Sequence, residues 1–196
     1  MRRLLATLLV AVSSGIVVFA RTPAAQDELP NVKALGRAVS QYKDDALHAV
    51  VAYNYSQREH DSRWILIELA VTSSRPMTIH RDGIFLRTPD VRIIELASQR
   101  RFREDLQRVT LLLQNAAAQN HPVDSYFNLR RNEAQRMTFF ARPFEGIVHD
   151  DFVVSNDRLA VGSLFFESPR GLWDAGAYIL TVQSDRARAE LPIALN

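Results

Sequence analysis

Near the C-terminus the chain reads Trp173-Asp174-Ala175-Gly176-Ala177-Tyr178-Ile179-Leu180-Thr181-Val182, and this segment is the most informative for the fold class. An Asp and small residues precede a Tyr, and the Tyr opens an apolar run that is typical of a β-strand. In the run that follows, the inward positions are apolar: Ala189, Leu191, Ile193 and Leu195. Pro192 falls on the opposite face. Because a proline donates no backbone hydrogen bond, this last strand is predicted at the edge of a sheet.

The segment from Asp174 to Leu180 resembles the tyrosine corner of immunoglobulin-like β-sandwiches. In that corner a Tyr at the start of a late strand bonds back to the backbone through its hydroxyl. The resemblance implies that Asp174 and Tyr178 form such a structural corner. Leu180 stands where antibody domains carry their second Cys, and the chain has no Cys. The resemblance is therefore to relatives of the fold that lack the disulfide.

Strand-like runs rich in Val, Ile, Tyr and Phe occupy most of the chain after Ala46. The predicted runs are residues 47–56, 64–72, 83–96 as a hairpin, 136–141, 147–154, 159–167, 173–182 and 189–195. In the second run one face carries Ile65, Ile67, Leu69 and Val71. In the hairpin, Pro89 presets the turn, but Val91 stands where such turns favour Gly, which predicts a bulge or a longer loop. Residues 46–196 are thus predicted to form a mainly β domain, an immunoglobulin-like sandwich of about seven to nine strands.

Two segments depart from the strand pattern. Residues 26–45 are expected to form a linker or a short helix, because four apolar residues fall at helical spacing: Val32, Leu35, Val39 and Tyr42. Residues 98–119 are expected to form one inserted or capping helix, with its apolar residues in an arc of about 100°. Leu111 and Leu112 lie outside that arc, so we expect them to pack under a loop or to form a partner surface.

The predicted helix also carries a basic face formed by Arg100, Arg101 and Arg108. Glu104 lies four residues from both Arg100 and Arg108, and Asp105 lies four residues from Arg101. Because these acidic residues can pair with the arginines, a solvated helix face is favoured over a ligand-binding patch.

Residues 1–25 have the three parts of a secretory signal. Arg2 and Arg3 precede an apolar run from Leu4 to Ala20, and small residues follow before a polar stretch. Cleavage after Ala20 and cleavage after Ala25 both fit this pattern. We therefore expect an exported protein, periplasmic or secreted. The alternative is an uncleaved N-terminal helix that anchors it, since the run is near the shortest that spans a bilayer.

Charge and cysteine content restrict the partners further. The chain carries 24 basic and 22 acidic residues, and without Arg2 and Arg3 the two counts are equal. A nucleic-acid partner therefore has no electrostatic support, and a membrane partner is expected only if the leader is retained. Because the chain has no Cys, an exported form must rely on its core for stability. For the same reason no lipid is attached through a Cys.

Metal or catalytic chemistry has little support in the sequence. The weak candidates for metal ligation are His149, Asp150 and Asp151, which would need a third group nearby. Gly162 and Ser163 lack the second Gly of a nucleophile elbow. We therefore expect no cofactor and no catalytic residues.

Aromatic residues offer a further candidate surface. Tyr53 and Tyr55 alternate on one predicted strand and Trp64 opens the next, so they could stack on a sugar or a peptide. Core packing is the favoured interpretation, because aromatic residues are enriched in strands.

The sequence as a whole favours a non-catalytic binding or interaction module of the cell envelope or periplasm, whose partner is another envelope protein or polymer. One alternative is an extracytoplasmic enzyme or metal-binding domain that uses His149, Asp150 and Asp151. Another is a structural accessory domain of a surface or secretion assembly. The sequence leaves the ligand and the oligomeric state open.

Overall fold

The computed structural model describes residues 29–59, 61–118, 122–128 and 133–196. This part of the chain holds twelve strands and three α-helices, so the predicted mainly β class is confirmed. The predicted signal helix and both cleavage positions lie outside the described residues. Within the described residues, no helix is long and apolar enough to cross a membrane.

The larger sheet has six strands in the order β1-β2-β3-β4-β10-β8. Their bounds are β1 Val32–Gly36, β2 Val39–Lys43, β3 Leu47–Ala52, β4 Trp64–Ser73, β10 Arg158–Glu167 and β8 Glu133–Arg136. Neighbouring strands are antiparallel except β10 and β8, which are parallel. The two longest strands of this sheet, β4 and β10, pair with each other.

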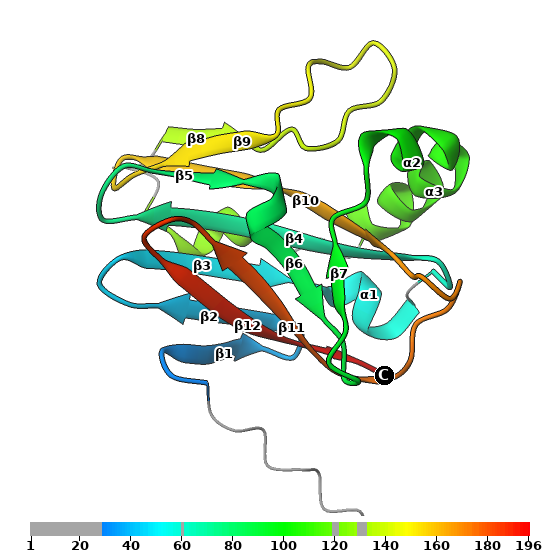
Figure 1. Cartoon of the computed structure of the whole chain (residues 1–196), viewed down its shortest axis with the longest axis horizontal. Coiled ribbons are helices and arrows are strands. Elements are labelled where there is room, and N and C mark those ends of the chain that lie inside the picture. The colour runs from blue at the N-terminus through cyan, green and yellow to red at the C-terminus, as the bar shows by residue number, and fades with distance from the viewer. Residues whose placement is uncertain (1–28, 60, 119–121, 129–132) are drawn as a thin grey trace, which may run out of the picture.

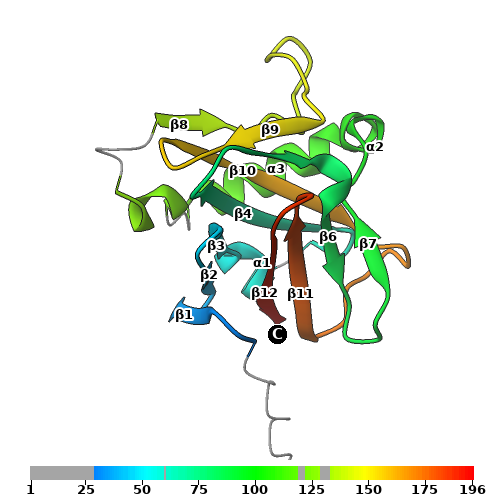
Figure 2. The same ribbon diagram turned by 60° about the vertical axis from the view of Figure 1, so that its left-hand side comes forward.

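The smaller sheet has four strands in the order β12-β11-β6-β7, and its strands lie across those of the larger sheet (Figures 1 and 2). Their bounds are β12 Arg188–Leu195, β11 Gly176–Gln183, β6 Ile84–Arg87 and β7 Ile93–Glu95. A third, two-stranded sheet pairs β5 (Met77–His80) with β9 (Asp151–Val154). β12 has a partner on one side only, as predicted from Pro192.

One apolar core lies between the two principal sheets. The larger sheet contributes the predicted face of β4, and the smaller sheet contributes alternate residues of β11 and β12, such as Leu180 and Leu191. Each such side chain adds roughly 1.5 to 3 kcal/mol when it is buried. This arrangement is consistent with a β-sandwich.

The opposite face of the larger sheet is covered by helices. α2 (Gln99–Glu104) and α3 (Leu106–Ala117) pack on the second face of β4 and β10 through Trp64, Leu66 and Phe165. The single-turn helix η2 (Val123–Tyr126) covers the same face farther along the sheet. β4 is therefore buried on both faces, which explains why Trp64 and Leu66 interrupt its simple alternation.

The prediction of a linker or short helix in residues 26–45 was wrong, because β1 and β2 occupy the described part of that segment. Val39 is buried on the outer face of the sheet, whereas Tyr42 is buried in the central core. A strand that buries both faces can place apolar residues three apart, and this spacing imitates a helix. Pairing with β3, which the local sequence does not show, decides the outcome.

The single helix predicted over residues 98–119 is two helices that meet at Asp105, and residue 119 lies outside the described part. Asp105 leaves helical geometry, with φ −112° and ψ 26°. Its carboxylate accepts a hydrogen bond from the indole Nε1 of Trp64 at 2.7 Å. The partner that fixes the break lies on β4, far away in sequence.

The end of β3 differs from the prediction, whereas the predicted hairpin is present. The run predicted over residues 47–56 ends at Ala52, and Tyr55 belongs to the short helix α1 (Asn54–Glu59). The hairpin of β6 and β7 is present, and Val91 in its turn adopts a φ of 65°. A five-residue loop therefore replaces the tight turn that Pro89 alone would favour.

Candidate binding groove

An open groove of about 630 Å³ lies on the helix-covered side of the larger sheet. α2 and α3 form one wall, β10 the floor, and residues 136–145 the other wall. We call it the outer groove. It is lined by Phe102, Leu113, Arg136, Met137, Thr138, Phe140, Ala141, Arg142, Glu145, Gly162, Ser163 and Phe165.

Three phenylalanines from three separate elements meet in the groove. Phe165 of β10 lies edge-on to both Phe102 of α2 and Phe140, with ring centroids 5.2 Å and 5.0 Å apart. Phe102 and Phe140 are also in contact at 5.2 Å. Edge-to-face packing of this kind holds the rings in fixed orientations. Phe102 and Phe165 are each 2% exposed, so this cluster packs beneath the groove, and Phe140 is its partly exposed ring.

Gly162 lets the second wall approach the sheet closely. The backbone nitrogen of Met137 donates to the carbonyl of Val161 at 2.7 Å, just beyond the end of β8. A Cβ on Gly162 would lie only 2.7 Å from the Cβ of Met137 and 2.9 Å from its carbonyl oxygen. Any side chain here would push this wall away from β10.

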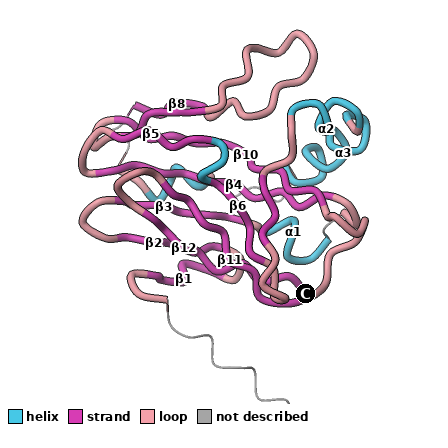
Figure 3. The backbone as a smooth tube through the Cα atoms, in the orientation of Figure 1, coloured by secondary structure: helices cyan, strands magenta, loops and turns pink. Residues whose placement is uncertain are grey.

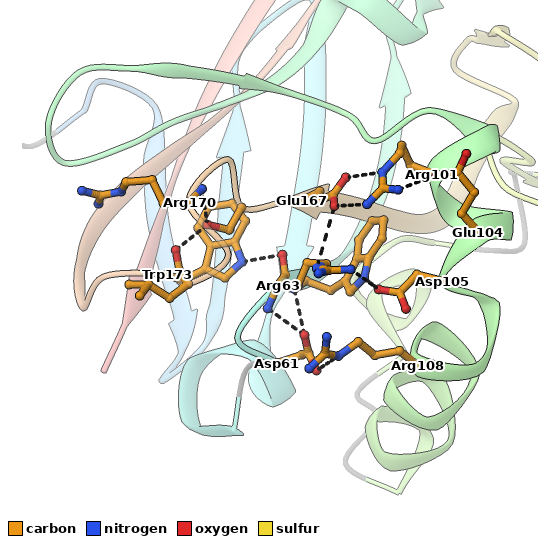
Figure 4. Close-up of polar contacts among 12 residues, drawn as sticks. Asp61, Arg63, Arg101, Glu104, Asp105, Arg108, Glu167, Arg170 and Trp173 are labelled. Atoms are coloured by element: carbon orange, nitrogen blue, oxygen red, sulfur yellow. Dashed lines mark hydrogen bonds and ion pairs between the residues drawn. The ribbon is translucent and has the colours of Figure 1, made fainter.

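Ion pairs hold the helix wall against the sheet (Figure 4). Arg101 of α2 forms a bidentate pair with Glu167 at the end of β10, with distances of 3.0 Å and 2.6 Å. Asp105 accepts from both Trp64 and Arg63, the latter at 3.3 Å. A planar, two-bond arginine–carboxylate pair fixes orientation as well as distance. These contacts hold α2 and the start of α3 against β4 and β10.

A further ion pair holds α3 against the loop that precedes β4. Arg108 donates to Asp61 at 2.8 Å. The other carboxylate oxygen of Asp61 accepts from the backbone nitrogens of Arg63 and Trp64 at 2.7 Å and 3.1 Å. The predicted basic face is therefore largely paired, but Arg108 pairs with this loop residue and not with Glu104.

Residues 142–150 form a loop that projects from the body between β8 and β9 (Figures 1 and 3). The Phe144 side chain at its turn is fully exposed, and Ile147 is 75% exposed. Phe144 has a φ of 66°, a region that non-glycine residues seldom adopt. The backbone nitrogen of Glu145 donates to the carbonyl of Arg142 at 3.1 Å and closes the turn.

The base of this loop is tied to the rest of the fold. Arg81 donates to the carbonyls of Phe139 and Ala97, the former at 2.8 Å, and its guanidinium lies 4.7 Å from the Phe140 ring centroid. Gln99 at the start of α2 exchanges two hydrogen bonds with the backbone of Ala141, at 2.6 Å and 3.2 Å. The groove wall and the helix wall are thereby joined at one end.

The rim of the groove is basic. Arg136 is exposed and makes no hydrogen bond or ion pair with any described side chain. Arg142 makes one long ion pair with Glu145 at 3.5 Å. An exposed guanidinium in the same groove as the partly exposed Phe140 suits a ligand with an acidic group next to an apolar one.

The predicted metal candidates are only partly brought together. His149 and Asp151 line a small cavity of about 190 Å³, which Arg136 and Arg158 also line. Asp150 contributes its backbone carbonyl to the nitrogen of Arg81 at 2.7 Å. The described residues include no group of three or more His, Cys, Asp or Glu side chains suited to a metal ion. The two guanidiniums oppose a cation in this cavity.

The predicted partner surface is wrong for Leu112, whose side chain is 2% exposed. It packs with Trp64 and Phe102 because α3 buries a wider arc than the sequence pattern indicated. Leu111 is 55% exposed. Of the other aromatic candidates, Trp64 and Tyr53 are buried and Tyr55 is partly buried.

The corner segment has the geometry of a tight structural link. The Tyr178 hydroxyl donates to the backbone carbonyl of Asp174 at 2.8 Å, and burial raises the pKa of that hydroxyl. The Asp174 carboxylate forms an ion pair with Arg170. Gly176 has a φ of 152°, and a Cβ there would lie 2.8 Å from Pro89 of the hairpin turn.

The sequence did not single out Glu68 as a titrating group. It lies on the outer face of β4, opposite Ser163 of β10, and makes no hydrogen bond or ion pair with the described residues. Burial, together with the negative charge of Asp124 in η2, raises the pKa of its carboxyl to about 7. The signal in the sequence was a single acidic residue, Glu68, among the apolar residues of the predicted strand 64–72.

Comparisons with protein-family models, with curated proteins and with solved structures gave no match.

Proposed function

We propose that the chain is a non-catalytic interaction module whose outer groove holds an extended, apolar and acidic segment of another envelope protein. The observation that carries this proposal is a groove of about 630 Å³ in which the partly exposed Phe140 and the exposed Arg136 both line the surface. Aromatic residues and arginine are the side chains that dominate protein–protein hot spots.

The lining of the groove favours a chain segment over a small compact ligand. It is lined by polar as well as apolar groups, including Thr138, Ser163 and Glu145. Small-molecule sites are usually enclosed and mostly apolar. A peptide presents both apolar side chains and polar backbone groups. It can therefore contact both the apolar and the polar lining of the groove.

Export and fold family form the finer part of the proposal. The secretory pattern of residues 1–25 supports a periplasmic or secreted location. Two sheets around one core, with the Tyr178–Asp174 bond at the start of β11, support an immunoglobulin-like relationship. The parallel pairing of β8 with β10 is a departure from the antiparallel sheets of that family.

The test uses the full exported chain and a displayed library of random heptapeptides. We expect the enriched peptides to combine two apolar residues with an acidic one, and to lose at least about tenfold in affinity for Ser163→Trp, which fills the floor, and for Arg136→Glu. Leu111→Ser is the matched control, because Leu111 is exposed but does not line the groove. Equal binding to Ser163→Trp and to the parent protein, with circular dichroism showing both folded, would refute the proposal.

A further inference from the structure

We infer that a hollow beside β1 binds an anionic amphiphile, a small molecule with one aliphatic chain and one acidic head group. The hollow has a volume of about 870 Å³ and lies between β1, the turn that precedes it and the face of the smaller sheet that points away from the core. We call it the β1 hollow. It shares no lining residue with the outer groove, so this inference stands apart from the proposed function.

Hydrogen bonds fix the walls of the β1 hollow. The Ser40 hydroxyl of β2 donates to the carbonyl of Pro192 in β12 at 3.0 Å, which joins the two sheets where they meet. The backbone nitrogen of Lys43 donates to the carbonyl of Asn31 at 2.9 Å and ties the turn before β1 to β2. Asn31 has a φ of 66°, a region that Asn adopts more readily than most residues. The hollow is therefore part of the folded structure and needs no ligand to form.

Aliphatic side chains make up most of the lining. Ile179 of β11 and Pro192 of β12 are paired in register and alternate with the core residues of their strands. Each of the following lining residues is partly or largely exposed: Leu29, Val32, Ala34, Ala177, Ile179 and Pro192. The aromatic ring among the lining residues, that of Tyr178, is 2% exposed. The hollow thus offers aliphatic surface and no aromatic surface on which a nucleobase would stack.

Arg87 of β6 supplies the charge. Among the described residues that line the hollow, it alone is charged. The register places it between Ile179 and Ile93 of β7, and its side chain is partly buried. It forms no hydrogen bond or ion pair with the described residues, including Glu95, which lies two residues beyond Ile93. A guanidinium with apolar neighbours gains most from a carboxylate or a phosphate that binds it directly.

The lining favours a lipid-like anion over a peptide. A peptide segment needs partners for its backbone amides and carbonyls. Ser40 cannot supply one, because it is 4% exposed and its hydroxyl is already bonded to Pro192. An aliphatic chain has no such need, and its contact with the lining removes apolar surface of both from water. The volume also lies in the range of small-molecule sites.

Isothermal titration calorimetry of the full exported chain with sodium decanoate, up to about 5 mM, tests the inference. We expect a dissociation constant at or below about 1 mM. Octanoate should bind roughly tenfold more weakly than decanoate, because each buried CH₂ contributes about 0.8 kcal/mol. 1-Octanol, which has the same chain without the charge, should bind at least about tenfold more weakly than octanoate.

Substitutions assign the binding to the β1 hollow. Arg87→Gln should weaken decanoate binding at least about tenfold, and Ala34→Trp, which fills the hollow from an exposed position on β1, should abolish it. Arg188→Gln is the matched control, because Arg188 lies on the same sheet, pairs with Glu190 at 2.5 Å and does not line the hollow. Ser163→Trp alters only the outer groove and should bind decanoate as the parent protein does.

The opposite results overturn the inference. These are the absence of binding at the highest decanoate concentration, equal binding by the parent protein and a folded Arg87→Gln variant, and equal affinities for octanol and octanoate. Loss of decanoate binding in Ser163→Trp would assign the ligand to the outer groove. Binding to phosphatidylglycerol vesicles that requires Arg87, without binding of free decanoate, would assign the hollow to a membrane surface.

Discussion

The indole Nε1 of Trp64 donates a hydrogen bond to the carboxylate of Asp105 at 2.7 Å, and this contact joins the central strand of the sheet to the break between two helices. Arg63 binds the same carboxylate. Asp105 therefore stands at the end of α2 and the start of α3, and its side chain holds this break against the start of β4 (Figure 4).

Asp105→Ala is expected to destabilise the fold by about 1 to 3 kcal/mol, because it leaves the buried indole N–H without an acceptor. Urea unfolding followed by tryptophan fluorescence measures this loss. Glu104→Ala is the neighbouring control and should cost less than about 1 kcal/mol, since its ion pairs are exposed. Equal effects of the two substitutions would contradict the assigned role of Asp105.

Leu112→Ala and Leu111→Ala form a matched pair on adjacent positions of α3. Leu112 is 2% exposed, so its truncation should cost about 2 to 5 kcal/mol through lost burial and a cavity under the helix. Leu111→Ala should change stability by no more than about 0.5 kcal/mol. Thermal unfolding of the two variants compares them directly. Comparable shifts in both would show that Leu112 is not internal.

Gly162→Ala is expected to displace the wall of the outer groove, because its Cβ would meet the backbone oxygen of Met137. The predicted loss is about 1 to 3 kcal/mol, with faster amide exchange at Met137. Gly36→Ala is the control: a Cβ there meets only Val39 at an ordinary 3.9 Å. Amide exchange at Met137 that is unchanged in the Gly162 variant would contradict the close approach.

Glu68 makes the stability of the protein depend on pH. Its carboxyl pKa rises from an ordinary 4.5 to about 7 in the folded state, so the folded protein retains a proton that the unfolded chain has released. Stability from this group is therefore lost as the pH rises from about 4.5 to 7. Glu68→Gln should stabilise the protein at pH 8 by about 1 to 3 kcal/mol and have little effect at pH 4. A gain that is the same at both pH values would refute this assignment.

The strands that the sequence predicted best are those whose pattern is local. Ile65 and its alternate neighbours could be assigned to one face because side chains on a strand alternate regardless of partner. The corner segment could also be predicted from the sequence, because the Tyr178 hydroxyl donates to a carbonyl only four residues away. In these cases the residues that determine the geometry are close in sequence.

The groove could not be predicted because its parts are distant. Phe102, Phe140 and Phe165 are far apart in the sequence, and only the fold brings their rings into contact. The exposure of Phe144 depends on the path of the loop, which Arg81 and Gln99 fix from elsewhere. The helix break at Asp105 likewise depends on Trp64.

The position of β4 between β3 and β10 has a consequence for the order of assembly. β4 and β3 are adjacent in the chain, so four strands of the larger sheet can form once residues 29–73 are available. The other edge of β4 must wait for β10, about 90 residues later, and closing that distance is slow. Until then an apolar strand with an open edge faces solvent, which is the kind of surface that aggregates. A chain that emerges N-terminus first would pass through this state each time. It would need protection from aggregation until its C-terminal half is available.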